Sequence, residues 1–428
     1  MMTTEVNRRL TQVGPTTPMG DLLRRYWHPI AGASELHHQA IKAVRLFGED
    51  LVLFRTLAGT YGLIGRRCVH RGAELTVGFV EHDGIRCGYH GWHFNRSGIC
   101  TDRPFDRTRR PGVPPDVRPL PAYPVQEKAG LLWAYLGPQP APELPDWDVF
   151  HWPDSFTQIA TLEIPCNWLQ CQENAVDPVH FEWLHNNLPR RQLQPDSEFS
   201  TRTLNLQVDD APWGLLTRRY REGSDTDTPL WRIGRAILWP NGWYFGHHFE
   251  WKVPIDDHRT LLVIWAKLHV PTERTPYHQN SIPTWHGQLY DDDGRPRLNY
   301  LANQDIAAWV SQGVIADRTQ ESLSASDVGV VMLRRRLLDD LDAIAHGLDP
   351  RAVLRDPTFN VRLPLPCIAL EALRDGLPLA EMQSHPLIGP LLNDFYLLAG
   401  QPPEVKAQFE AAMGVPGAPV EVHTFVPQ

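Results

Sequence analysis

Two short segments, each carrying one cysteine and one histidine, place the strongest constraint on what this chain can fold into. They read Cys68-x-His70 and Cys87-x-x-His90. On two adjacent loops they would present two thiolates and two imidazoles to one site. That donor set fits a tetrahedral zinc ion, or a [2Fe–2S] cluster in which cysteines hold one iron and histidines hold the other.

The spacing favours the iron–sulfur cluster over zinc. Zinc fingers group cysteine with cysteine and histidine with histidine, whereas each segment here contributes one of each. A cluster with two chemically different irons needs this arrangement, because each loop then reaches both metals. The pattern resembles that of Rieske proteins, which implies that Cys68 and Cys87 bind one iron and that His70 and His90 bind the other. Cys100 has no partner nearby, and we expect a packed thiol there.

Composition and charge exclude several classes of protein. The 428 residues are 42% hydrophobic and 21% charged, which is typical of a globular chain with about two to four domains. A net charge of -9 without a basic stripe argues against a nucleic-acid partner, and six cysteines are too few for a disulfide scaffold. Apolar runs such as Leu261–Trp265 fall far short of the roughly 20 residues that span a bilayer, and no signal peptide is visible. We therefore expect a cytoplasmic protein without a membrane partner.

Changes in composition along the chain suggest three regions. Residues 1–40 form an N-terminal segment that we expect to pack on the third region, residues 41–140 form an all-β domain, and residues 141–428 form this third and largest region. The stretch 138–148 between the last two is rich in proline. Residues 305–346 read as helical with a break near 317–326, so the fold class is α+β. Five runs predict a large antiparallel sheet: Leu204–Val208, Leu215–Tyr220, Trp231–Trp239, Trp243–Val253 and Thr260–Val270.

A second group of polar residues lies early in the third region and reads Asn174-x-x-Asp177-x-x-His180-x4-His185. Two histidines five apart diverge by about 140° on a regular α-helix, so they converge only if the helix is distorted or if the second lies at its end. Asp177-Pro178 reads as a helix N-cap followed by proline at the first helical position. Two histidines and one carboxylate on one face of Fe(II) form the arrangement that activates O2, so a carboxylate from elsewhere is needed.

This segment resembles the mononuclear-iron motif of Rieske non-haem iron oxygenases. In that family the third ligand comes from a helix much later in the chain, which opens with an acid or amide followed by aspartate. Gln304-Asp305 fits, so the resemblance implies Asp305 as the carboxylate ligand beside the two histidines. Asp317 and Asp327 are the other candidates for the carboxylate ligand, but we interpret Asp317 as a turn residue and Asp327 as a helix cap.

The resemblance covers most of the chain and looks like the phthalate dioxygenase group of oxygenase (α) subunits. Besides the cysteine–histidine loops, it rests on Gln12–Gly20 and Gln304–Arg318. It implies a bacterial homotrimer with a Rieske [2Fe–2S] cluster in the all-β domain and a mononuclear Fe(II) in a helix-grip-like catalytic domain. No glycine-rich dinucleotide fingerprint is visible, so an NAD(P)H-dependent reductase of the flavin or ferredoxin type would be a separate protein.

Members of the family pair the cluster of one subunit with the mononuclear iron of the next. The resemblance therefore implies that the Asp177 carboxylate bridges His90 of one subunit and His180 of its neighbour, and that Asn174 lies near the iron. The implied reaction uses O2 and two electrons to oxygenate a small aromatic substrate, an aromatic carboxylate or diaryl ether, by dihydroxylation or monooxygenation. O- or N-demethylation and simple electron transfer are the alternatives.

The substrate pocket is the least constrained part of the chain. We expect it between the large sheet and the polar 271–303 loop, apolar with a few polar anchors. The candidate aromatic walls are Trp183, Trp239, Trp243 and Phe245. The candidate carboxylate anchors are Arg218, Arg219, Arg232 and Arg235. At most half of these arginines can point inward, because alternate residues of a strand face opposite ways.

Overall fold

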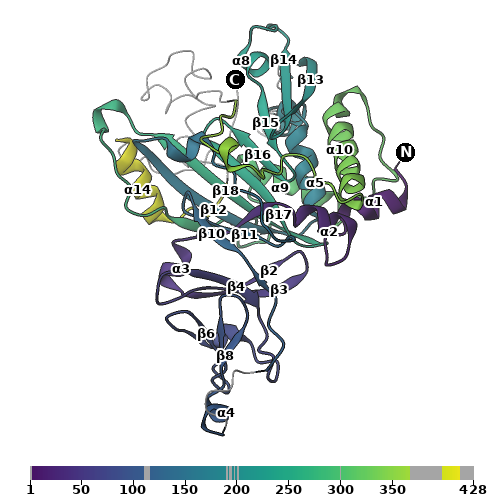
Figure 1. The fold of residues 1–428 in the computed structure, drawn as a ribbon. Coiled ribbons are helices and arrows are strands. Elements are labelled where there is room, and N and C mark those ends of the chain that lie inside the picture. The colour runs from purple at the N-terminus through teal and green to yellow at the C-terminus, as the bar shows by residue number, and fades with distance from the viewer. Residues whose placement is uncertain are drawn as a thin grey trace.

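The computed structural model describes residues 2–109, 116–188, 191, 195–196, 198–199, 202–298, 300–366 and 398–414, so Cys367 lies outside the described residues. The described strands form one sheet of eight strands, two of four and one of three. Figure 1 shows the two four-stranded sheets at one end of the molecule, and the eight-stranded sheet with most of the helices at the other. An all-β domain thus joins a larger domain of sheet and helices, which confirms the predicted α+β class.

The smaller domain is built from short antiparallel strands. One sheet has the order β2(Ile41–Leu46), β3(Glu49–Arg55), β4(Tyr61–Gly65), β9(Ala122–Tyr123). The other has the order β5(Phe79–Val80), β6(Gly84–Arg86), β7(His93–Asn95), β8(Cys100–Asp102), and it is flanked by η1(Leu75–Val77) and α4(Pro104–Arg109). A two-residue turn joins β2 to β3, because Phe47 and Gly48 both take positive φ, 48° and 79°, as a type I′ hairpin turn requires. The core of this domain includes both Cys68 and Cys87.

A three-stranded sheet ties the N-terminal segment to the rest of the chain. Its order is β1(Trp27–Gly32), β11(Leu131–Tyr135), β10(Val125–Lys128). Helices α1(Thr4–Thr11) and α2(Pro18–Leu23) precede β1, and α3(Glu35–His38) follows it. Thr3 and Thr17 start the first two helices as N-caps, since their hydroxyl oxygens accept from backbone N–H groups of the first turn. Both helices contact α10 of the larger domain.

The larger domain is centred on the eight-stranded sheet. Its order is β13(Thr203–Ala211), β14(Gly214–Arg221), β15(Arg235–Leu238), β16(Gly242–Phe245), β17(His248–Asp256), β18(Arg259–His269), β12(Ser155–Ile164), β19(Thr284–His286). Neighbouring strands are antiparallel, except that β12 and β19 are parallel. The α-helices are α5(Trp168–Val176), α6(His180–Glu182), α8(Pro229–Arg232), α9(Leu301–Ser311), α10(Val328–Ala345) and α14(Pro403–Met413). Single turns complete it: η2(Asp148–His151), η3(Trp183–Asn187), η4(Thr272–Arg274), η5(Ala325–Asp327) and η6(Pro357–Phe359).

Helix α5 is the element that brings sheet and helices together. It contacts β17, α9 and α10 (Figure 1). Gly329 allows α10 to approach, because a Cβ at that position would lie 2.3 Å from the Val176 carbonyl oxygen of α5. None of the described helices is both long and apolar enough to cross a lipid bilayer.

Strand β17 presents two chemically different faces. Phe249 and Trp251 stack on one face with ring centroids 5.0 Å apart, inside the main hydrophobic core. The intervening residues His248, Glu250 and Lys252 are buried on the opposite face, because side chains alternate along a strand. A polar stripe therefore lies under the helices of this domain.

Most of the predicted strands of the larger domain are confirmed, and a few segments differ. Trp231 belongs to α8 and not to a strand, since Pro229 starts a short helix there. The run Trp243–Val253 is two strands, separated by a turn in which Gly246 takes a φ of 62°. The unpredicted strand β12 lies between β18 and β19, and β19 itself falls within the predicted 271–303 loop. Part of that loop is therefore an edge of the sheet.

Candidate metal centres and active site

Each cysteine–histidine segment of the smaller domain forms a tight turn. The Gly72 N–H donates to the Cys68 carbonyl oxygen at 2.9 Å, and the Gly91 N–H donates to that of Cys87 at 3.0 Å. Both glycines take positive φ, 74° and 72°, which a residue with a side chain adopts only with strain. The turns bury the two cysteines, each 2% exposed, and leave the two histidines exposed.

The four side chains gather at one place but do not converge on a single point. The ring centroids of His70 and His90 are 4.5 Å apart, and Trp92 stacks on His70 at 4.6 Å. Burial raises the pKa of Cys68 to about 11, and the neighbouring Cys87 contributes to the rise. Across the described residues these four are not a group whose ligand atoms all lie within 4.8 Å of one another. A tetrahedral zinc ion needs such a group, so the loops fit a two-metal cluster better.

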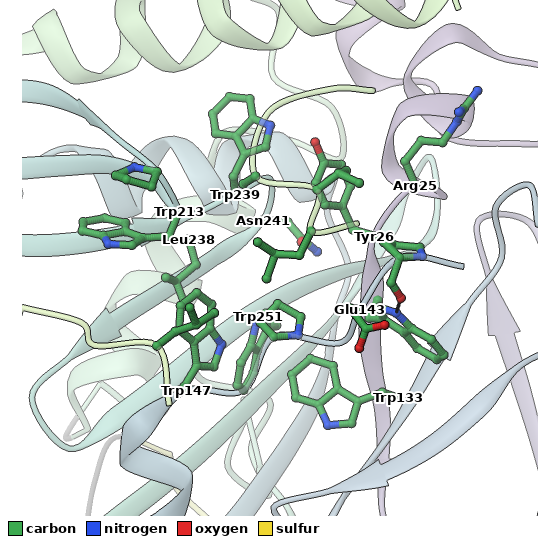
Figure 2. A pocket seen from close by; sticks show the side chains of 18 of the residues that line it. Arg25, Tyr26, Trp133, Glu143, Trp147, Trp213, Leu238, Trp239, Asn241 and Trp251 are labelled. Carbon is green, nitrogen blue, oxygen red and sulfur yellow. Dashed lines mark hydrogen bonds between the residues drawn. The ribbon is translucent and has the colours of Figure 1, made fainter. Parts of the chain in front are cut away.

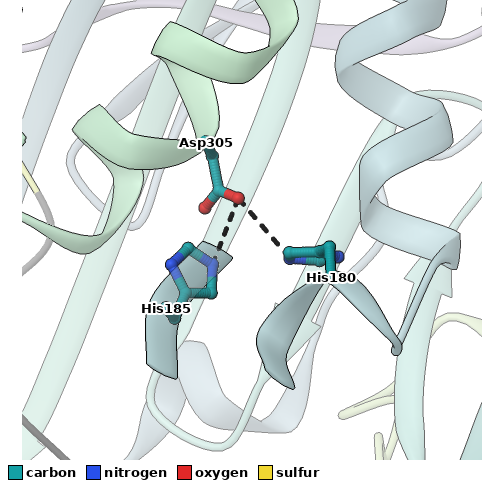
Figure 3. Close-up of side chains that lie close together, drawn as sticks. All are labelled: His180, His185 and Asp305. Atoms are coloured by element: carbon teal, nitrogen blue, oxygen red, sulfur yellow. Dashed lines mark ion pairs between the residues drawn. The ribbon is translucent and has the colours of Figure 1, made fainter. Parts of the chain in front are cut away.

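Three side chains from separate segments meet at a second site, in the larger domain. The His180 Nε2 atom lies 3.5 Å from Asp305 Oδ1, and the His185 Nε2 atom lies 3.2 Å from the same oxygen (Figure 3). Within the described part of the chain, these residues form the one group of potential ligands whose atoms all lie within 4.8 Å of one another. We refer to these three residues as the triad.

A π-helical turn removes the divergence expected of histidines five residues apart. Turn η3 follows α6 directly, and its wider repeat adds one residue to the turn. The rings of His180 and His185 therefore face the same side, with centroids 5.2 Å apart. Helix distortion, and not a position at the helix end, is thus the way in which the two histidines converge.

Hydrogen bonds on the far side of each ring decide which nitrogen faces Asp305. The His180 Nδ1–H donates to the backbone oxygen of Asp177 at 2.5 Å, and the His185 Nδ1–H donates to Gln304 Oε1 at 2.9 Å. In the neutral form of either ring, the Nε2 atom therefore carries the lone pair. Burial lowers the pKa of His180 well below its ordinary value, and the neighbouring His185 contributes, so this ring is neutral. Gln304 orients one of the triad's rings, a role that its place in the sequence motif does not reveal.

The triad has the properties of a metal site. Two lone pairs and a carboxylate oxygen that face one another repel unless a cation lies among them. The His185 Nε2 atom is buried, and it has no hydrogen-bond partner among the described residues. Two neutral imidazoles and one carboxylate are the donor set of non-haem Fe(II) sites, which keep open positions for O2. The residues present therefore fit a mononuclear iron.

Asn174 and Asp177 lie beside the triad. The Asn174 Nδ2–H donates to Asp305 Oδ1 at 3.2 Å and so holds the carboxylate in place. The Asp177 Oδ1 atom accepts from the Val179 N–H at 2.8 Å, and its Oδ2 atom lies 3.9 Å from His180 Nδ1. Asp177 ends α5 as its C-cap, so the predicted reading as the N-cap of the next helix is wrong.

Asp305 does not open its helix as the motif predicts. Helix α9 begins at Leu301, which places Asp305 in the second turn. The position still brings its carboxylate to the histidines, because α9 contacts both α5 and η3. The competing acids lie elsewhere: Asp317 closes a turn with Thr319, and Asp327 completes the capping box of η5.

A buried ion-pair network anchors α5, the helix that carries Asn174. Glu173 accepts from Arg318 Nη2 at 2.7 Å and from Arg334 Nε at 2.6 Å. The arginine side chains are 1% and 9% exposed; Arg334 also pairs with Glu321, whereas the Arg318 charge is compensated by Glu173. The network links α5 to α10 and to the segment that follows α9.

We expect Glu173→Ala to lower the free energy of unfolding by about 3–5 kcal/mol, because it leaves buried guanidinium charge without its partner. Chemical denaturation of the parent and the variant measures the change. Glu163→Ala is the matched control, since that side chain is 65% exposed, and we expect it to change stability by less than about 0.5 kcal/mol. Equal losses in the two variants would contradict the role given to Glu173.

A narrow cavity of about 30 Å³ opens beside the triad. Its walls come from α5, α6, β16, β17 and the start of α9, so Leu301 and Ala302 are the described residues of the predicted 271–303 loop that line it. Little free volume is thus left beside the triad, and Phe181 is one of the residues that bound it. The polar wall made by His248, Glu250 and Lys252 is missing from the sequence-based site, although its alternation on a strand is readable.

Of the four aromatic residues predicted to form walls, Trp243 lines this cavity and the others do not. Trp183 is 49% exposed, and Phe245 stacks behind Trp243 with ring centroids 5.9 Å apart. Trp239 lines a separate cavity of about 300 Å³, whose walls also include Trp133, Trp147, Trp213 and Trp251 (Figure 2). That cavity lies on the other face of the sheet, since alternate residues of β17 face opposite ways.

Two of the four predicted anchors, Arg219 and Arg235, are buried next to the cavity wall. Their guanidinium carbons lie 4.9 and 4.2 Å from the ring centroid of Phe181. Neither Nε atom has a hydrogen-bond partner among the described residues. Burial lowers the pKa of Arg235 to about 9, and Arg221 nearby adds to the fall. Of the other two, Arg218 pairs with an acid of β13, and Arg232 lies in α8.

Comparisons with known proteins identify the relatives of this chain. Residues 26–124 match the family model described as Rieske [2Fe-2S] domain, and residues 296–357 match the model described as LigXa C-terminal domain like. The chain is 47% identical to the 5,5'-dehydrodivanillate O-demethylase oxygenase subunit of Sphingobium sp. (strain NBRC 103272 / SYK-6), over 97% of this chain and 98% of that one. The chain belongs to the Rieske non-haem iron oxygenase family.

This Rieske oxygenase is also 32% identical to the phthalate 4,5-dioxygenase oxygenase subunit of Pseudomonas putida, over 81% of this chain and 88% of that one. Its fold is similar to that of NdmA from Pseudomonas putida CBB5, with a TM-score of 0.56 and 21% identity over 78% of this chain and 96% of that one. The predicted family, the oxygenase class and the two kinds of iron cofactor are confirmed. The zinc-module and electron-carrier alternatives no longer apply.

Proposed function

We propose that this Rieske oxygenase oxygenates an aromatic carboxylate at the triad formed by His180, His185 and Asp305. The observation that carries the proposal is the meeting of two Nε2 lone pairs with a carboxylate oxygen beside a cavity. Iron bound there supplies the activation of O2. The chain itself holds both imidazoles in the required tautomer, and Asn174 holds the carboxylate.

We assign the [2Fe–2S] cluster to Cys68, His70, Cys87 and His90. The buried cysteines fit the closed side of a cluster, and the exposed histidines fit the side that passes electrons onward. Figure 1 supports an electron acceptor on another subunit, because β6 and β8, beside these loops, lie in the part of the smaller domain that is away from the larger domain and its helix α9.

The surface around the cluster loops supports assembly into a homotrimer. Large apolar side chains are exposed there, and they include Val69, Val77, Phe79, Tyr89 and Ile99. An apolar rim of this kind is typical of a surface that is buried on association. In the proposed trimer the cluster of one subunit faces the triad of the next, and the Asp177 carboxylate, 28% exposed, bridges His90 and His180.

A separate redox protein supplies the electrons in this proposal. The curated relatives are named as oxygenase subunits, which implies further components. We assign the role to an NAD(P)H-dependent reductase of the flavin or ferredoxin type, which acts with the oxygenase in the bacterial cytoplasm.

The two buried arginines support a substrate with a carboxylate. Arg219 and Arg235 lie behind Phe181, and neither forms an ion pair with a described residue. Buried charge without a partner is costly, and a planar guanidinium matches a carboxylate bidentately. Movement of the Phe181 ring would both widen the cavity and give a carboxylate access to this positive charge.

One observation favours a second candidate, O-demethylation of an aromatic methyl ether. The relative named as an O-demethylase subunit is 47% identical over nearly the whole chain, against 32% for the phthalate relative. In that reaction O2, two electrons and two protons convert the ether into a phenol, formaldehyde and water. Dihydroxylation of a ring consumes the same reactants but keeps both oxygen atoms in one product.

Single-turnover product analysis tests both candidates. We expect holoenzyme with its cluster reduced to convert an aromatic acid when O2 is added, from a panel of phthalate, methoxybenzoates, diaryl ether acids and 5,5'-dehydrodivanillate. Formaldehyde identifies demethylation, and a cis-dihydrodiol identifies dihydroxylation. The proposed function is wrong if no carboxylated aromatic compound is converted while the reduced cluster is oxidised normally by O2.

A further inference from the structure

Three polar side chains on β17 form one wall of the cavity beside the triad. His248, Glu250 and Lys252 alternate along the strand and line the same cavity as His180 and Asp305. All three are buried, and the Lys252 side chain is only 1% exposed. Such groups are rarely placed on the buried face of a strand unless they bind something.

The charges of this polar wall compensate one another. The Lys252 Nζ–H donates to Glu250 Oε2 at 2.9 Å, and the His248 Nε2 atom lies 3.6 Å from Glu250 Oε1. Burial alone would raise the pKa of Glu250, but Lys252 and His248 together lower it to about 2. The wall therefore combines a carboxylate acceptor with an ammonium donor and carries no excess charge from this pair.

A neutral wall with a donor and an acceptor selects a particular kind of ligand group. A substrate carboxylate placed here would face the Glu250 carboxylate and be repelled. A hydroxyl group can donate to a Glu250 oxygen and accept from Lys252 or His248, so it satisfies both halves of the wall. The positive charge suited to a carboxylate lies elsewhere, at Arg219 and Arg235, whose Nε atoms have no hydrogen-bond partner among the described residues.

We infer that the substrate of this Rieske oxygenase carries a ring hydroxyl in addition to its carboxylate, and that His248, Glu250 and Lys252 bind this phenol. The inference rests on the proposed function, which supplies the aromatic ring. Aromatic side chains beside the wall agree with it: Trp243 lies 5.8 Å from Lys252 Nζ by its ring centroid, and Phe181 lines the same cavity. The substrate class is then that of hydroxylated aromatic acids.

Matched pairs of acids test the inference on the holoenzyme. The pairs are 3-methoxybenzoate with 4-hydroxy-3-methoxybenzoate, phthalate with 4-hydroxyphthalate, and any acid converted in the product analysis with its analogue that gains or lacks a ring hydroxyl. We expect kcat/KM to favour the hydroxylated member by at least about tenfold, because that member alone can donate a hydrogen bond to Glu250 and accept one from Lys252 or His248.

Variants show whether the polar wall causes this preference. Glu250→Gln weakens the acceptor, and the double variant Glu250→Leu with Lys252→Met removes both charges without leaving either unpaired, so that it folds even if the single variant does not. We expect both to reduce the preference to less than about twofold. Lys267→Met is the control, because Lys267 is a buried lysine of β18 that does not line the cavity. We expect this variant to keep the parent's preference for the hydroxylated acid.

The outcomes separate the two proposals. Conversion of an aromatic acid with no preference for the hydroxylated member overturns the inference and leaves the proposed function standing. A preference that survives in the double variant also overturns it, since the phenol would then be bound elsewhere. If no aromatic acid is converted at all, the proposed function fails, and the inference fails with it.

Discussion

Asp305→Ala is expected to remove the mononuclear iron and to lower turnover by more than about 100-fold, while the [2Fe–2S] cluster stays in place. The Asp305 Oδ1 atom is the point that both histidine Nε2 atoms face, and it carries the negative charge of the triad. Even groups that only support a metal ligand contribute about 10–100-fold to affinity or activity, so the loss of a ligand should exceed that range. The visible spectrum of the cluster should not change.

Metal analysis and steady-state assays measure the effect. Iron content should fall from about three to about two atoms per chain. Asp317→Ala is the matched control, because Asp317 lies in a turn away from the triad and should keep both iron and activity. A variant at position 305 that retains full iron would show that another residue completes the site.

Asp177→Asn is expected to leave both metal centres occupied and still lower turnover by about 100-fold. Its backbone oxygen, which holds His180, is unchanged by the substitution, and an asparagine Oδ1 can still accept from the Val179 N–H. What is lost is the negative charge, which in the proposed trimer lies between the cluster of one subunit and the iron of the next. Burial raises the pKa of Asp177, so this carboxyl is suited to take part in proton movement.

Stopped-flow oxidation of the reduced cluster separates this effect from damage to either metal. We expect normal iron content, a normal cluster spectrum and slow cluster oxidation in the presence of substrate and O2. Asp317→Asn serves as the control, because that carboxylate accepts from Thr319 within a turn and should not influence the rate. Fast oxidation in the position-177 variant would rule out the bridging role.

The ligands near one another in sequence were predictable, because local spacing alone brings them together. The two cysteine–histidine segments each lie within one turn, closed by Gly72 or Gly91. The assignment of Asp305 needed the family resemblance, since nothing in the local pattern links α9 to α5. The placement of His180 and His185 on one side depends on a π turn, which leaves no clear signal in side-chain periodicity.

The walls of the active site could not be read from the sequence for a different reason. Aromatic and basic residues are plausible walls wherever they occur, and only tertiary packing separates Trp243, which lines the cavity, from Trp239, which lies across the sheet. The alternation of the polar-wall residues along β17 could be recognised in the sequence, but their distance from the triad could not. A strand pattern shows which residues share a face, and the connections between elements decide what that face meets.

The π turn at η3 also sets a limit on how this site can change. If the same residues formed a regular α-helix, with better backbone geometry, the two imidazoles would diverge by about 140° and would no longer face the same side. Local regularity and iron binding are thus opposed within a segment of six residues. The irregular segment therefore has to be stabilised by contacts from other elements. Gln304 of α9, whose side-chain oxygen accepts a hydrogen bond from His185, is placed to do so.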